Sequence, residues 1–247
     1  MLSMILWGLG SVLEIGILVR GLRARMVTKY PYFYFYMLCV AAGSLGLYPL
    51  YGTPVYTKYY WPVHLVTTVA GCAVVLEILT LALASYAGAA RFLRRLCMLL
   101  LGAVVCYGWA RVALGGLNTA ARTERDLRLV EAVFLAAMLL VANYYSIRLG
   151  RNLKGLILGF GGYVGISLIA LSQFIATGPP FLKLLLGYLQ TGAYVLALVI
   201  WTVALWSYAP NPVPERRAIE PDYEILALQT RERLKEIGDQ LKGTARP

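Results

Sequence analysis

Seven stretches of mostly apolar residues, each about 17 to 27 residues long, fill the chain from residue 2 to residue 208. A helix of about 20 apolar residues is long enough to cross the hydrocarbon core of a bilayer. The pattern therefore predicts an all-α bundle of seven transmembrane helices within residues 1–209. The expected spans are about 2–19, 32–52, 62–86, 95–117, 127–148, 154–177 and 181–208.

The distribution of basic residues predicts the orientation of this bundle. Three alternate turns hold ten Lys and Arg and no acid: Arg20, Arg23, Arg25, Lys29, Arg91, Arg94, Arg95, Arg148, Arg151 and Lys154. The other turns hold Lys58, Arg122, Arg125, Arg128 and Lys183. Because loops rich in Lys and Arg stay in the cytoplasm, we expect the N-terminus outside and the C-terminus inside. The net charge of +11 thus indicates topology and contact with membrane lipid, not nucleic-acid binding.

The residues after the last span have a different character. Segment 210–247 is rich in charged residues of both signs, and residues 222–242 have apolar positions at helical spacing. We expect a short amphipathic helix in a cytoplasmic tail, where it could contact a protein partner.

The sequence contains none of the residue patterns typical of metal sites, haem ligation or catalysis. His64 is the only histidine, and the four cysteines lie within expected spans without a CxxC spacing. We therefore expect no metal, no cofactor and no enzymatic activity. His64 itself is expected to be an interfacial hydrogen-bonding residue or a pH sensor.

Polar residues inside the expected spans predict two clusters, because ionisable side chains at bilayer depth face the bundle interior. Glu77 lies on a stripe of small residues, and Glu14 and Asn143 fall at a similar depth, which predicts an inner polar cluster. The alternative is a buried hydrogen-bonded clamp between helices.

A second cluster is expected in the outer half. Arg111 and Glu131 are expected to pair because helices joined by a short connection are antiparallel neighbours. Gln173, Gln190 and Tyr194 would complete a ligand pocket open to the outside. A dry ion pair with amide cross-links would explain the same residues.

Span 154–177 is rich in glycine, with Gly155, Gly159, Gly161, Gly162 and Gly165. Such spacings allow helices to approach closely. They indicate packing within the bundle or the seam of a homodimer.

Segments 59–77, 124–135 and 148–167, and above all the string from Leu149 to Gly161, resemble a family of small, uncharacterised seven-helix membrane proteins of acidobacterial type. The resemblance implies seven helices and a bacterial inner membrane. It transfers no site residues.

These observations favour a receptor-like or sensor-like protein that couples an outer pocket to its cytoplasmic tail. The alternative is a structural or accessory subunit of a larger membrane complex, docked along span 154–177. A small transporter is a further interpretation.

The charge asymmetry makes the orientation testable by cysteine-accessibility labelling. A cysteine at position 58 should react with a membrane-impermeant reagent added outside, and a cysteine at position 93 only after the membrane is opened. The reverse pattern would invert the topology.

Overall fold

The computed structural model describes residues 2–84, 95, 98–99, 102–103, 105–110, 117–144, 147–175, 179–212, 228–233 and 235. Within these residues the chain is helical and contains no strand. Residues 2–212 form one unit and the described tail residues 228–233 and 235 belong to a second, helical unit.

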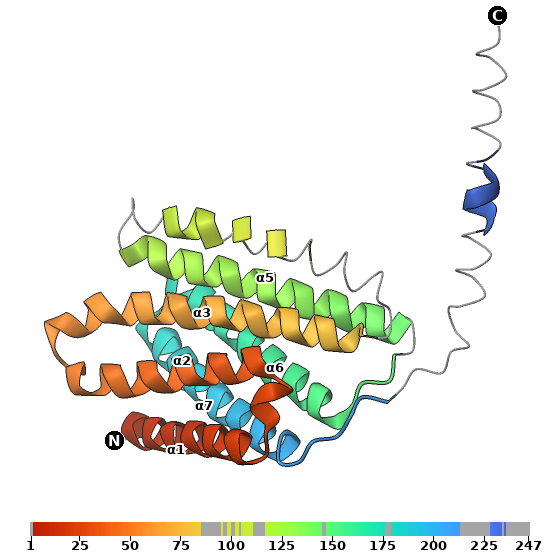
Figure 1. The fold of residues 1–247 in the computed structure, drawn as a ribbon. Helices are drawn as coiled ribbons and strands as arrows, with labels where there is room; N and C mark the ends of the chain where they lie inside the picture. Colours follow the sequence, from red (N-terminus) through yellow and green to blue (C-terminus); the bar gives the residue numbers. More distant parts are fainter. Residues whose placement is uncertain are drawn as a thin grey trace, which may run out of the picture. The chain divides into compact units, whose positions relative to one another are not determined.

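The described elements of the first unit are long helices and two short 3-10 helices (Figure 1). They are α1 (Leu2–Arg23), η1 (Met26–Thr28), α2 (Pro31–Leu47), η2 (Tyr48–Leu50), α3 (Pro54–Ala82), α5 (Leu117–Tyr144), α6 (Arg151–Ile175) and α7 (Pro180–Ala204). Three of the long helices, α2, α3 and α7, have a proline at their first position, where its missing N–H is not needed.

Six of these helices are long and apolar enough to cross a membrane: α1, α2, α3, α5, α6 and α7. They suggest a multi-pass membrane protein. The expected span 95–117 lies largely outside the described residues, although residues 105–110 are helical. The count of seven spans therefore stays a prediction.

Two helices begin earlier than the apolar pattern suggests. α3 starts at Pro54, whereas the predicted span starts at residue 62, so Pro62 lies inside the helix. α5 starts at Leu117, whereas the predicted span starts at residue 127. The charged stretch from Arg122 to Arg128, expected as a turn, is therefore helical.

The six helices pack as a closed ring in chain order (Figure 1). Each contacts its neighbour in the chain, α3 contacts α5, and α1 returns to pack against α7. Aromatic rings fill the centre: Phe33 lies edge-on to Trp201 at 5.2 Å, and Tyr36 lies edge-on to Phe160 at 5.6 Å. Many large apolar side chains instead point outward, as expected of helices that face lipid.

The chain just after α7 is contacted by the last turn of α1 and by the start of α6. Arg20 Nη2 donates to the Trp206 carbonyl at 2.8 Å, and Arg151 Nη2 donates to Ser207 Oγ at 2.6 Å. Asn152, which is fully buried, donates to the carbonyls of Ala204 and Ser207 and accepts from the backbone N–H of Ala209 at 2.7 Å. Two of the basic turns used to predict the topology thus share one end of the bundle.

Two glycines of α6 allow this helix to lie against α7. A Cβ on Gly155 would overlap the side chain of Ala204, and a Cβ on Gly159 would lie 2.5 Å from Trp201 Nε1. Gly161, Gly162 and Gly165 have no atom within 4 Å of such a Cβ. Gly155 and Gly159 therefore serve packing within the bundle.

This difference between glycines of one helix can be measured. Gly159→Leu should destabilise the bundle by about 1–3 kcal/mol or more, because Trp201 and α7 must move aside. Gly162→Leu places the same side chain in open space on the same helix and should change stability by much less. Thermal unfolding in detergent compares the two, and equal losses would show that the α6–α7 contact is not close.

Candidate functional site

A cavity of about 470 Å³ lies between the helices of the first unit. Residues from α1, α2, α3, α5, α6 and α7 and from the turn after η2 contribute to its wall. Its wall is mixed: aliphatic and aromatic side chains surround a few polar ones. The aromatic and polar lining residues are Trp7, Glu14, Tyr36, Ser44, Tyr51, Tyr56, Tyr60, His64, Thr67, Arg128, Tyr163, Gln190, Thr191 and Tyr194.

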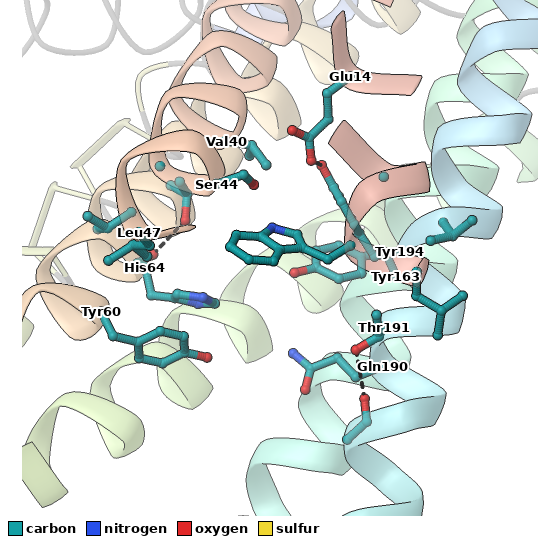
Figure 2. Close-up of a pocket in the computed structure, with 18 of the residues that line it drawn as sticks. Glu14, Val40, Ser44, Leu47, Tyr60, His64, Tyr163, Gln190, Thr191 and Tyr194 are labelled. Carbon is teal, nitrogen blue, oxygen red and sulfur yellow. Dashed lines mark hydrogen bonds between the residues drawn. The ribbon is translucent and has the colours of Figure 1, made fainter. Parts of the chain in front are cut away.

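The polar groups come from opposite sides of this space, as Figure 2 shows. Glu14 and Tyr194 meet on one side, where α1 and α7 are neighbours. Tyr60 and His64, both on α3, stand on the other side. Gln190 and Thr191 of α7 lie on the same side as Tyr194. A molecule in the cavity would therefore contact an acid, an imidazole, an amide and several phenols.

Glu14 is the carboxylate of this cavity. Its side chain is only 2% exposed, and Oε1 accepts a hydrogen bond of 2.8 Å from Tyr194 Oη. Ser44 of α2 is a further polar neighbour. The other oxygen, Oε2, has no hydrogen-bond partner among the residues that the structure describes. An unpaired buried polar atom is costly, so Glu14 is not explained as a fully satisfied structural contact.

Arg128 of α5 brings a buried positive charge to the same cavity. It is 1% exposed, and Nη1 donates to Glu131 Oε2 at 3.1 Å. Nη2 lies 3.9 Å from Glu124 Oε1, and the guanidinium carbon lies 5.1 Å from the centre of the Tyr163 ring. Two acids and an aromatic face therefore stabilise this guanidinium.

Two residues of α3 extend the network on either side of Arg128. His64 Nδ1 lies 3.4 Å from Glu124 Oε1, and its ring stacks on Tyr60 with centroids 4.1 Å apart. Cys72 Sγ donates to Glu131 Oε1 at 3.5 Å. Gly71 leaves room for that acid, since a Cβ there would lie 2.7 Å from Glu131 Oε1. The network thus ties α3 to α5 beneath the cavity wall.

Of the five residues expected in an outer pocket, two line the cavity, two lie elsewhere and one is outside the described residues. Gln190 and Tyr194 line the cavity, whereas Glu131 lies behind Arg128, to which it is bonded. Gln173 is half-buried on α6 and does not belong to the cavity wall. Arg111 lies outside the described residues, so its pairing with Glu131 stays a prediction.

The residues expected in an inner polar cluster have separate surroundings. Glu77 is 5% exposed and accepts from the backbone N–H groups of Tyr32 at 3.1 Å and Phe33 at 2.9 Å. These are free donors of the first turn of α2, so the carboxylate caps that helix. Glu14 faces the cavity, and Asn143 is exposed on α5. In the described part of the chain, no hydrogen bond joins these three side chains.

Sequence reasoning missed Arg128 and Glu124, which it assigned to a turn. A signal was available: Glu124, Arg128 and Glu131 are spaced by four and three residues, so on a helix they share one face. His64 was identified as a polar residue at the start of a span, but its partner on α5 was not. Among the described residues, no cluster of His, Cys, Asp and Glu could hold a metal ion.

A double-mutant cycle tests the buried pair. Arg128→Met alone should cost about 3–5 kcal/mol, because Glu131 is left charged and unpaired in the interior. Combining it with Glu131→Gln should recover part of the loss. Simple addition of the two losses in unfolding experiments would show that the residues do not interact.

Comparison with protein-family models, with curated proteins and with solved structures gave no match. The chemistry of the cavity and of the network beside it is therefore the basis for inferring function.

Proposed function

We propose that this protein is a receptor-like membrane protein that binds a small molecule in the cavity between α1, α2, α3 and α7. Its volume of about 470 Å³ lies in the range of small-molecule sites. The site has the usual composition of such pockets, in which mostly apolar walls carry a few polar groups.

The observation that carries this proposal is the unpaired oxygen of Glu14. A structural clamp would have its polar atoms satisfied, as Glu77 does through two backbone N–H groups. Glu14 is more deeply buried and lines the cavity, yet Oε2 lacks a partner in the described residues. This difference favours a binding site over the alternative role of a purely structural subunit.

The helices that line the cavity also reach the opposite end of the bundle. α7 lines the cavity between Gly187 and Val195, and the residues after it are held by α1 and α6 through Arg20 and Asn152. The chain continues from there into the tail after Pro212. A ligand that changes the position of α1 against α7 would therefore act on the residues that lead into the tail, which we propose contacts a protein partner.

Filling the cavity tests the proposal without removing any polar group. Gly187 lines the cavity, and a Cβ there meets no atom within 4 Å, so Gly187→Leu should fold while it occupies binding space. A library of small cationic, neutral and anionic compounds is screened by thermal shift on the protein in nanodiscs. Some compounds should raise the midpoint of the natural protein by a few degrees and leave Gly187→Leu unchanged.

The matched control is Gly192→Leu. Gly192 lies on the same helix, is equally free of neighbours and does not line the cavity. Compounds that bind the cavity should stabilise this variant as they stabilise the natural protein. If no compound acts, or if all three proteins respond alike, the cavity is not a binding site.

A further inference from the structure

We propose that the ligand of this cavity is an organic cation, whose ammonium group pairs with Glu14 and whose carbon skeleton packs among the surrounding tyrosines. The inference rests on the proposed function and adds the chemical class of the ligand. It is carried by three features of the cavity: a carboxylate without a cation partner, a guanidinium that already has its own acids, and walls rich in aromatic rings.

The carboxylate sets the sign of the charge that the cavity attracts. Glu14 lines the cavity and accepts one hydrogen bond from Tyr194, and in the described part of the chain no basic side chain pairs with it. An ionised carboxylate away from water needs a cation or several strong donors. In the described part of the chain, the cation of the cavity wall is Arg128, which already has its own acids. An ammonium group of a ligand would supply the missing charge.

Arg128 does not make the cavity favourable for an anion. Its guanidinium is bonded to Glu131 and has Glu124 as a second acid, 3.9 Å away. Glu124 also approaches His64. The positive charge of Arg128 is therefore already matched by acids outside the cavity wall, whereas Glu14 is an acid of the wall itself.

The aromatic walls give a cation a second source of stabilisation. Trp7, Tyr36, Tyr51, Tyr56, Tyr60, Tyr163 and Tyr194 line the cavity. Cations are attracted to the faces of such rings, and recognition of alkylammonium ligands by aromatic cages is a common use of this attraction. The cavity wall itself contains such a contact, where the guanidinium of Arg128 lies over the ring of Tyr163. The rings of Tyr163 and Tyr194 also pack against each other with their centres 5.2 Å apart, so two of these rings are held in place.

Three probes of similar size and different charge test the inference: phenethylammonium, phenethyl alcohol and 3-phenylpropionate. Each is titrated at neutral pH against the full-length protein in nanodiscs made of uncharged lipid. The ammonium probe should bind at least about tenfold more tightly than the alcohol, which corresponds to about 1.4 kcal/mol, and the propionate more weakly still. This comparison requires only the natural protein, so it holds even if a variant fails to fold.

Glu14→Gln then assigns the preference to one side chain. The amide oxygen can still accept from Tyr194, but the charge is gone. The ammonium probe should lose its advantage over the alcohol to within about twofold. Glu77→Gln is the matched control, because it also removes a buried carboxylate. Glu77 bonds to α2 and does not line the cavity. It should keep the preference for the ammonium probe.

Different results overturn different statements. Tighter binding of the alcohol or the propionate, or an unchanged preference in Glu14→Gln, would overturn the assignment of an organic cation and leave the binding site intact. A library in which only neutral or anionic compounds stabilise the protein, with Gly187→Leu insensitive to them, would do the same. Failure of every compound in the library would overturn the proposed function itself.

Discussion

A charged side chain buried among apolar helices must find its partners inside the protein, because neither water nor lipid tails are there to replace them. This constraint organises the described bundle. The guanidinium of Arg128 joins Glu131 and Glu124, and Glu124 in turn approaches His64 of α3. The apolar surfaces of α3 and α5 allow many relative rotations, whereas these contacts are compatible with few of them.

The same constraint acts on backbone groups at the ends of helices. The first N–H groups of a helix have no partner within it, and those of α2 are taken by the carboxylate of Glu77 on α3. Asn152 of α6 likewise satisfies the carbonyls of Ala204, the last residue of α7, and of Ser207 just after it. In each case a polar side chain from one helix completes the end of another, and this fixes how the helices are staggered. Among the described residues, Glu14 Oε2, Arg128 Nε and Thr123 Oγ1 are buried without a hydrogen-bond partner, and Glu14 and Arg128 both line the cavity.

Hydropathy and helix length predicted most of the helical spans, because these properties are local and depend on runs of about 20 residues. The small-residue stripe around Glu77 correctly placed that residue in the interior, where it is buried against α2. Its partners could not be predicted, since they are backbone groups whose positions depend on the path of the chain after η1.

The charged stretch before residue 129 was wrongly predicted as a turn, because a segment rich in charged residues is typical of turns when each residue is considered separately. Once Arg128 and Glu131 are paired on one helical face, the same stretch is the beginning of α5. The cavity depends on the rotation of six helices at once. Of its polar lining residues, sequence patterns assigned only Gln190 and Tyr194 to a pocket, and they assigned Glu14 to the inner cluster instead.

The bonds of Asn152 have a mechanical consequence. The amide side chain of Asn152 makes three hydrogen bonds to residues at and just after the end of α7. The glycine contacts between α6 and α7 bring the two backbones close together over the neighbouring turns. Sliding α7 along α6 would break these bonds and force Trp201 against the α6 backbone. The two helices are therefore suited to tilt together as one rigid body, with α1 as the helix against which they move.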